Sequence, residues 1–417
     1  MLRTKVVEMS APVLKSSVAI MCALGFSLPT AVQAACDTLF EATVTTGGVS
    51  QQICVDSAQS LYDLAIRDAG LTFPGYTQNS EVVSNLRIVG VDASLSYATN
   101  SRTLSLVIPE LGVNETFTGA TRRDSAVLLR RFLENNPDLL ARLQRRQAAV
   151  SPLSPITGVG GILPRAIMND FSASFSDTPT RIATSQSTAS QGSQSVLGAG
   201  ILLSSNTVAN TKVNTIAIPL SYSVRNDIDP RRQALVRGGI GMVDAGGSRS
   251  YQGRLSAGYR FPMSDEWVLT PMAGMSFAGS QDAAYAVGVG NASLASTYTW
   301  EFDGFDLTMG NMVGYYQTFK LPVKNTSDPK IRIAALVNGF FLSQPVSFGG
   351  NKMSVEYGFS DTRLGGTEVY QNNSQELTVS LGTNKSALSA RSFFRATLGL
   401  QRAIVSKGAS LSLNYWF

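Results

Sequence analysis

The chain ends in Ser410-Leu-Ser-Leu-Asn-Tyr-Trp-Phe417, where the side chains alternate in character from one residue to the next. One set comprises Ala409, Leu411, Leu413, Tyr415 and Phe417, and the intervening set comprises Ser410, Ser412, Asn414 and Trp416. Because successive side chains of a strand point to opposite faces, this pattern predicts a terminal β-strand with one apolar face.

The same pattern extends back along the chain to about residue 195. Alternating segments of roughly ten residues are separated by turn clusters, and we count about twelve, starting near residues 195, 212, 233, 251, 267, 293, 305, 331, 352, 375, 392 and 409. Hydrophobic residues make up 44% of the chain, yet no apolar run beyond the N-terminus is long enough for a spanning helix. A soluble β-protein or a transmembrane barrel fits these features.

The side chains of a soluble β-sandwich also alternate, so alternation alone does not distinguish it from a membrane barrel. The placement of aromatic residues is a second criterion. Six of them lie near strand ends, where the interfacial girdles of a membrane barrel belong: Tyr259, Phe261, Trp300, Phe302, Tyr415 and Phe417. Short connections near 262–265, 303–304 and 347–350 contrast with longer polar ones near 278–291, 320–330 and 361–374. We therefore predict a mainly β chain, with an antiparallel transmembrane barrel of about twelve strands over 191–417, preceded by a small α/β domain.

Residues 1–34 read as a signal peptide. Arg3, Lys5 and Lys15 supply the positive region, 18–28 is apolar, and 32–34 ends in Ala34 with a small residue two positions earlier. A membrane anchor is the alternative, but the apolar run is too short for one. A lipoprotein is a second alternative because Cys36 follows closely, although Gln33 stands where such proteins usually carry Leu.

Residues 35–150 are expected to form the small α/β domain. A strand over 40–46 and a turn at Gly47-Gly48 lead back towards Cys54, and a helix starts near Asp56. Two further strands, 86–97 and 103–117, would meet around a turn at 100–101. Apolar residues at helical spacing then predict a helix over 124–150 that Pro137 divides in two.

The predicted helical region is strongly basic. Seven arginines against three acidic residues between 122 and 146 give +4, most of the formal +5 of the chain. Five of these arginines are candidates for docking an anionic partner: Arg130, Arg131, Arg142, Arg145 and Arg146. The alternative is the solvated face of an amphipathic helix. Residues 151–190 are rich in Ser, Pro, Gly and Thr with little periodicity, so we interpret them as a linker or a lumen plug.

Cysteine and histidine usage limits the chemistry. Cys36 and Cys54 remain once the signal peptide is removed, and an even pair in an oxidising compartment predicts a disulfide. The chain has no His, which excludes a Ser-His-Asp triad and a His-ligated metal site. Acidic residues are too sparse in the strands to favour a glycosidase pair. We expect no enzyme, no metal and no cofactor.

Charged residues in the predicted strands would point into the barrel. The candidates for lining the lumen are Arg237, Arg254, Arg260, Arg395, Glu301 and Glu356. They could set a preference for anions in an open pore, or they could pair across a filled lumen and stabilise the barrel. The sequence leaves both readings open.

The terminal stretch resembles the C-terminal targeting signal of bacterial outer-membrane proteins, with Phe417 last and an aromatic residue, Tyr415, two positions earlier. The 195–417 region is similar in length and strand number to the translocator domain of autotransporters, including solitary barrels without a large passenger. This resemblance covers about half of the chain. It implies membrane insertion through the outer-membrane assembly machinery and a barrel in outer-membrane lipid. The α/β region is too short to be a typical repetitive passenger.

Two functions follow as hypotheses. In the first, the barrel is a channel or polypeptide translocator of the Gram-negative outer membrane, plugged by the 151–190 segment, with a client polypeptide or small solute as cargo. In the second, a non-transporting barrel anchors the basic domain, which binds the cell wall or another partner. Neither involves nucleic acid. We expect the N-terminal domain to be periplasmic if its linker ends at the periplasmic rim, and external if the linker threads through the pore.

Overall fold

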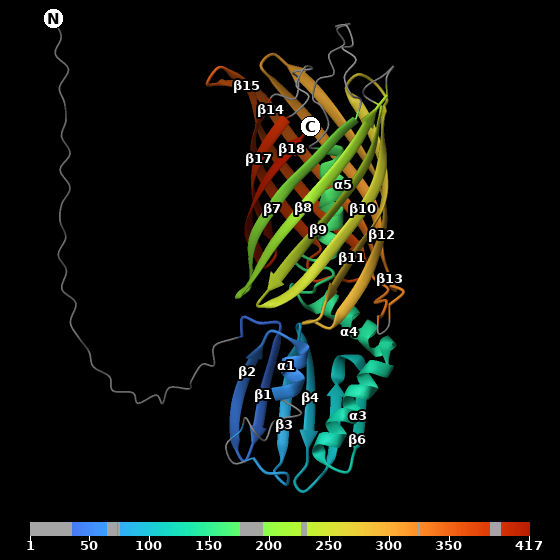
Figure 1. Cartoon of the computed structure of the whole chain (residues 1–417), viewed down its shortest axis with the longest axis vertical. Helices are drawn as coiled ribbons and strands as arrows, with labels where there is room; N and C mark the ends of the chain where they lie inside the picture. Colours follow the sequence, from blue (N-terminus) through green and yellow to red (C-terminus); the bar gives the residue numbers. More distant parts are fainter. Residues whose placement is uncertain are drawn as a thin grey trace, which may run out of the picture. The chain divides into compact units, whose positions relative to one another are not determined.

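The computed structural model describes residues 36–64, 73, 76–175, 195–226, 232–323, 326–383 and 393–417. The predicted signal peptide lies outside these residues, as does the 176–190 part of the predicted linker. The described chain contains a six-stranded antiparallel sheet with helices, and a closed barrel of twelve antiparallel strands (Figure 1). The predicted barrel and its strand number are confirmed.

The N-terminal sheet has the strand order β2-β1-β3-β4-β5-β6. Its strands are β1 (Phe40–Thr46), β2 (Val49–Val55), β3 (Val82–Ile88), β4 (Val91–Tyr97), β5 (Thr103–Ile108) and β6 (Val113–Thr118). The helices of this region are α1 (Ala58–Tyr62), the 3-10 helix η2 (Pro109–Leu111), α3 (Arg122–Asn135) and α4 (Pro137–Val150). Every neighbouring pair of strands is antiparallel, so the α/β unit takes the form of an antiparallel sheet with helices.

Two predicted strands each divide into two. The 86–97 segment turns at Val89-Gly90, where both residues have positive φ, and continues as β4. Valine rarely takes this conformation, so its presence concealed the turn. The 103–117 segment is interrupted by η2, because Pro109 supplies no N–H for the strand ladder. The turn at Asn100 has the positive φ that asparagine tolerates.

The helical region follows the prediction closely. Thr121 caps α3 in a reciprocal capping box with Asp124, which satisfies backbone donors of the first turn. Pro137 occupies the first position of α4, where its missing N–H costs nothing. Leu129 and Leu139 are buried with the apolar faces of the sheet strands in one core. The predicted division of the helix at Pro137 is confirmed.

The barrel strands are β7 (Ser195–Val208), β8 (Thr211–Arg225), β9 (Gln233–Ala245), β10 (Ser248–Pro262), β11 (Trp267–Ser280), β12 (Tyr285–Phe302), β13 (Phe305–Phe319), β14 (Arg332–Phe348), β15 (Asn351–Gly366), β16 (Asn373–Thr383), β17 (Phe393–Ala403) and β18 (Ser406–Trp416). Each pairs with its neighbours in sequence, and β18 pairs with β7 to close the cylinder. Most starts lie within about three residues of the predicted ones. The exception is β12, which begins at Tyr285 rather than near 293.

The predicted long loop over 278–291 is wrong, because β11 and β12 occupy all of it except residues 281–284. Its Val287-Gly-Val-Gly290 run alternates, but the valines face inward and the glycines occupy outward positions where other strands carry large apolar side chains, which hid the strand. Two-residue turns occur at both ends of the barrel, at Ala209-Asn210 on one side and Asp303-Gly304 on the other. Loop length therefore does not distinguish the two ends.

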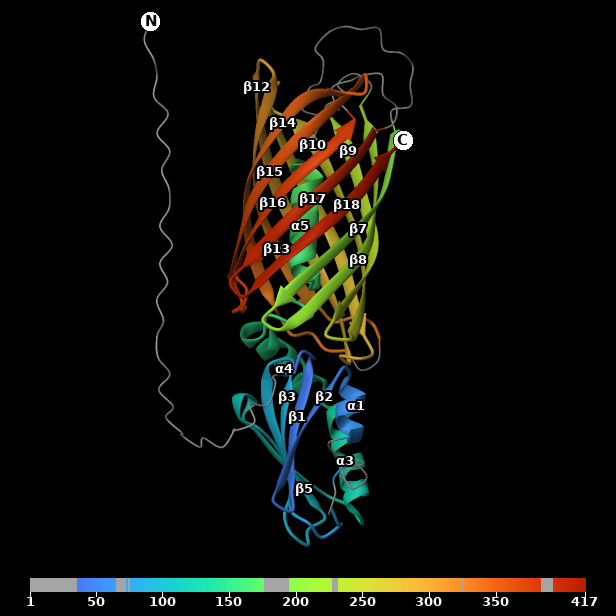
Figure 2. The same ribbon diagram turned by 90° about the vertical axis from the view of Figure 1, so that its left-hand side faces the viewer.

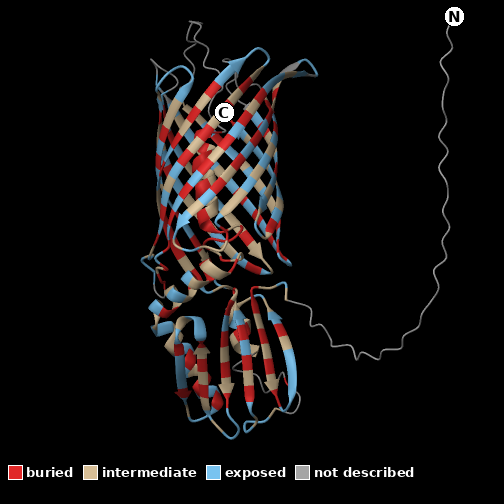
Figure 3. Cartoon of the chain, turned by 180° about the vertical axis from the view of Figure 1, so that it is seen from behind, coloured by how far each residue is buried: buried red, intermediate tan, exposed pale blue. Residues whose placement is uncertain are grey.

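Buried and exposed residues alternate along the barrel strands (Figure 3). The exposed positions carry large apolar side chains, and those more than half exposed include Ile240 (65%), Leu255 (55%), Val313 (54%), Leu398 (63%) and Leu400 (66%). The buried positions, which face inward, carry many Ser and Thr side chains. A soluble protein shows the reverse, so this outer surface fits lipid hydrocarbon. Among the described residues, no helix is both long and apolar enough to cross a membrane.

Candidate functional site: the barrel lumen and helix α5

The lumen of the barrel contains a helix, α5 (Ile162–Phe175), which both ribbon views place inside the ring of strands (Figures 1 and 2). This helix lies in the 151–190 segment, where we had predicted no regular element. A weak signal was present, since Leu163, Ala166, Ile167 and Phe171 recur at helical spacing. The helical periodicity is weak because packing in the lumen buries several sides of the helix, so its apolar residues are not confined to one face.

Three polar contacts hold α5 along its length. Before the helix begins, the Gly160 carbonyl accepts a hydrogen bond of 2.9 Å from Gln252 Nε2 on β10. Near its end, the Ala173 carbonyl accepts a bond of 2.7 Å from Arg260 Nη2, also on β10. A cation at that position satisfies a carbonyl of the last turn and complements the helix dipole.

The third contact is centred on Asp170, which is 2% exposed. One carboxylate oxygen, Oδ2, accepts hydrogen bonds from Asn291 Nδ2 (2.7 Å), Tyr316 Oη (2.9 Å) and Ser293 Oγ (3.4 Å). These donors lie on β12 and β13, on the wall against which α5 packs. A buried carboxylate requires such donors, because unpaired burial of a charge is costly.

Aromatic rings fill the space around the end of the helix. Phe171 and Phe175 stack at 4.8 Å between centroids, and Phe175 meets Phe341 of β14 edge-on at 5.6 Å. Gly310 of β13 and Gly339 of β14 face these rings, and a Cβ at either position would collide with Phe175 or Phe171. The missing side chains thus make room for α5.

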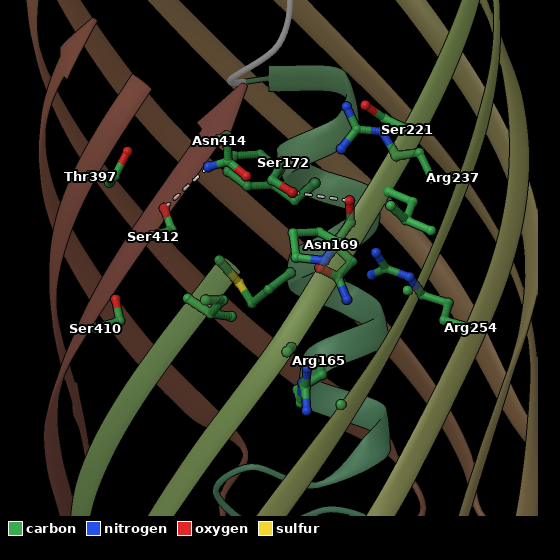
Figure 4. A pocket seen from close by; sticks show the side chains of 18 of the residues that line it. Arg165, Asn169, Ser172, Ser221, Arg237, Arg254, Thr397, Ser410, Ser412 and Asn414 are labelled. Carbon is green, nitrogen blue, oxygen red and sulfur yellow. Dashed lines mark hydrogen bonds between the residues drawn. The ribbon is translucent and has the colours of Figure 1, made fainter. Parts of the chain in front are cut away.

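The other side of α5 is less tightly packed. A cavity of about 310 Å³ lies between the helix and a wall that includes β7–β10 and β15–β18. In Figure 4, Arg165, Arg237 and Arg254 surround one side of the helix, while Thr397, Ser410, Ser412 and Asn414 lie on the opposite side of the cavity. The helix is therefore anchored on one face, and on another it borders a cavity lined by both polar and apolar residues.

Five of the six predicted lumen residues lie inside the barrel. Arg237 and Arg254 line the cavity, and Arg260 is bound to Gln233 as well as to α5. Arg395 and Glu356 form a buried ion pair at 2.8 Å, with their side chains 5% and 1% exposed. The Arg395–Glu356 pair has the stabilising role of one hypothesis, whereas Arg237 and Arg254 line the cavity, and an anion preference of the pore stays a prediction.

The sixth residue, Glu301, has the inward orientation expected from alternation but lies exposed next to the Asp303-Gly304 turn, beyond the buried part of the lumen. Sequence reasoning also missed two residues of the site, Arg165 and Asp170. Both lie on α5, and no local pattern predicts that their segment lies beside strands so distant in the sequence.

The five arginines proposed for partner docking lie on α3 and α4. Arg130, Arg131, Arg142 and Arg145 are exposed, and Arg146 is half-buried. Two of them have intramolecular partners, because Arg130 pairs with Glu134 and Arg146 with Glu110, both at 2.8 Å. The nearby Arg122 does not belong to this solvated face: it is 4% exposed and bonded to backbone carbonyls.

The remaining predicted residues are placed as follows. Cys36 and Cys54 form a disulfide, which confirms that pairing. Tyr415 and Phe417 point outward, and the Phe417 backbone exchanges hydrogen bonds of 2.8 and 2.9 Å with Leu197 of β7. The last residue thus closes the seam of the barrel. The described part of the chain contains no cluster of potential metal ligands.

No family model and no curated protein matches this chain. Among solved structures, it is similar to the β-domain of the Bordetella autotransporter BrkA (12% identity, TM-score 0.42, 54% of this chain and 99% of that one). It is also similar to the translocator domain of the autotransporter NalP from Neisseria meningitidis (12%, TM-score 0.43, 54% and 89%). An outer-membrane channel from Pseudomonas putida F1 is a further relative in fold (9%, TM-score 0.36, 54% and 95%). Likenesses at this level carry no argument about function, and the barrel assignment rests on its strand pairing.

Proposed function

We propose that this protein is a non-enzymatic, self-contained translocator of the outer membrane. Its barrel carries residues 36–150 to the cell surface and retains α5 as a plug. The observation that carries this proposal is the direction in which α5 runs through the lumen.

That direction follows from the two contacts with β10. Gln252, near the start of β10, binds Gly160 before α5, and Arg260, near the end of β10, binds Ala173 near the end of α5. Helix and strand therefore run the same way. In a barrel of twelve antiparallel strands, β10 ends at the rim where β7 begins and β18 ends. The chain thus enters the lumen at the rim opposite to both barrel termini.

The barrel termini supply the orientation relative to the membrane. If assembly starts from the periplasm, the termini remain on that side, because only connecting hairpins then have to cross the bilayer. The opposite rim is then external, and the residues immediately before α5 lie at that rim. This supports a surface location for residues 36–150, in place of the periplasmic one expected from the sequence, and matches the threaded-linker alternative.

The lumen contents support a plugged resting state. A helix of 14 residues spans about 21 Å, close to the height of roughly 25 Å for the apolar band of such barrels. It is packed by aromatic rings and anchored by Asp170 and Arg260. A single lumen helix of this kind fits a twelve-stranded barrel, which lies between side-chain-filled barrels and wide porins.

Trypsin treatment of intact cells tests the surface location. Exposed arginines such as Arg131 and Arg142 should be cleaved while the barrel band and a periplasmic marker protein stay intact. Cleavage only after permeabilisation of the outer membrane would contradict the proposal.

A planar-bilayer measurement tests the plug. Replacement of 162–175 by a Gly/Ser segment of equal length should raise single-channel conductance several-fold over the full chain, with Asn169→Ala as a control that leaves the anchors in place. No increase would indicate that the lumen is closed by something other than α5.

The exposed arginines of α3 and α4 favour a second candidate function, a barrel that only anchors a basic domain. The conductance after replacement of α5 does not separate this function from the first, because the helix occupies the lumen in both. Substitution of Arg131, Arg142 and Arg145 by Gln would instead abolish retention of the full chain on an anionic partner such as the cell wall.

A further inference from the structure

The cavity beside α5 has two chemically different walls. On one side, Arg165 of α5, Arg237 of β9 and Arg254 of β10 contribute guanidinium groups (Figure 4). On the other side, Ser410, Ser412 and Asn414 of β18 contribute hydroxyl and amide groups. The cavity is about 310 Å³, at the lower end of the range for small-molecule sites.

The arginines form a ladder along the lumen. The guanidinium of Arg165 lies against Gly241, whose missing side chain leaves room for it, and Gly241 pairs with Gln252. Arg254 is two residues further along β10, and Arg237 faces Ser256 two residues beyond that. Two residues of strand rise amount to roughly 6.6 Å, so the charged groups are close enough to repel one another.

Within this ladder, the guanidinium groups of Arg165 and Arg254 are incompletely hydrogen-bonded. Arg254 is repelled by Arg237 and Arg165 and attracted by Asp170, whose carboxylate already accepts three hydrogen bonds. Glu376 lies near Ser410 on the other wall of the cavity, and Arg395, which also lines it, is paired with Glu356. Buried nitrogens of Arg165 (Nη1) and Arg254 (Nε and Nη1) have no hydrogen-bond partner among the described residues.

Unpaired guanidinium N–H groups beside a cavity suit an oxygen-rich anion, because they can donate to two oxygens at once. The serine and asparagine groups across the cavity suit hydroxyl groups. We propose that the lumen binds a small hydroxylated organic anion of sugar-acid size, with its carboxylate on the arginine ladder and its hydroxyls towards Ser410, Ser412 and Asn414.

This inference goes beyond translocation and requires neither movement of α5 nor a surface location for residues 36–150. It depends only on the closed lumen as it stands. Its failure is therefore distinguishable from that of the proposed function, which protease treatment and conductance decide.

Isothermal titration calorimetry of the full chain in detergent, at constant low ionic strength, tests the site with gluconate, acetate and glucose. Gluconate should give saturable binding at least tenfold tighter than acetate, which lacks the hydroxyls, and glucose, which lacks the charge, should give none. Equal affinity for gluconate and acetate, or no saturable gluconate binding, would overturn the proposal.

Variants locate the site. Arg254→Gln and Arg165→Gln should each weaken gluconate binding at least tenfold, and Arg254→Lys should weaken it less. The matched control is Arg249→Gln on the same strand, since Arg249 is exposed and pairs with Asp244 outside the cavity. Arg165 lies on the plug rather than in the barrel wall, so its variant does not threaten barrel folding. Unchanged affinity in both glutamine variants would contradict the assignment.

Discussion

At the scale of single residues, the described lumen is organised around a buried carboxylate. Asp170 collects three donors from β12 and β13 on one oxygen and faces the charge of Arg254. Hydrogen bonds to a charged group typically contribute about 1.5–3 kcal/mol each. A side chain of α5 thereby connects the helix to the barrel wall.

We expect Asp170→Ala to loosen α5 by about 3 kcal/mol, because three donors and Arg254 lose their partner. Hydrogen–deuterium exchange of the 162–175 amides should then be roughly a hundred times faster. Asp170→Asn should have a smaller effect, since its amide oxygen still accepts. The control is Asn169→Ala, because Asn169 is next in sequence but faces the cavity. Equal amide exchange rates in the Asp170→Ala and Asn169→Ala variants would refute the role of Asp170 as an anchor of α5.

Arg122 has a structural rather than a docking role. Its guanidinium donates to the carbonyls of Ser80, Ala98 and Ser101 and lies 4.7 Å from the Tyr97 ring centre. We expect Arg122→Ala to destabilise the N-terminal sheet by about 3 kcal/mol, because buried carbonyls lose their donor. The measurement is the rate of chymotrypsin cleavage within 36–150 of the full chain. Arg123→Ala, at the exposed neighbouring position, should leave that rate unchanged; equal rates in the two variants would contradict this role.

At the scale of elements, α5 fits the barrel through glycines on the strands that face it. A side chain at Gly310 would collide with Phe175, whereas a Cβ at Gly253 would meet nothing within 4 Å. Overpacking typically costs about 1–3 kcal/mol.

We therefore expect Gly310→Val to displace the last turn of α5 and to produce channel openings in planar bilayers. Gly253→Val should remain as closed as the natural chain. If both variants stay closed, the contact between Phe175 and β13 does not hold the plug.

The alternation of apolar and polar side chains predicted most of the strands, but not all of their ends. The barrel strands were predictable because apolar and polar side chains alternate within each strand according to the side that faces lipid. Leu411 and Leu413, for example, alternate with Ser410 and Ser412. The start of β12 was misplaced because glycines interrupt its alternation. The hairpin at Val89-Gly90 was missed because a valine there takes an unusual conformation.

At the scale of the whole molecule, exposed apolar side chains have two different surroundings. Leu398 on β17 is 63% exposed and Val49 on the N-terminal sheet is 58% exposed. The first faces lipid and the second faces water. The same substitution should therefore have different consequences.

We expect Leu398→Arg to destabilise the folded barrel in lipid vesicles by about 2–4 kcal/mol, since a charge near the middle of the bilayer is costly. Val49→Arg should change stability by no more than about 0.5 kcal/mol, as is usual for a surface site. Guanidinium titration of both variants measures the difference. Similarly small effects in the two variants would mean that the exposed apolar side chains of the barrel strands do not face lipid hydrocarbon.

The sequence by itself determined the strand number, the disulfide and the absence of histidine chemistry, because these depend on local patterns or on composition; the export signal at residues 1–34 stays a prediction. Only the tertiary structure decided what fills the lumen and in which direction the chain passes through it. Asp170 meets Asn291 and Tyr316 across 121 and 146 residues of chain, and Arg260 meets Ala173 across 87. Contacts over such separations leave no periodic pattern in the sequence, since these residues meet only because α5 lies inside the closed barrel.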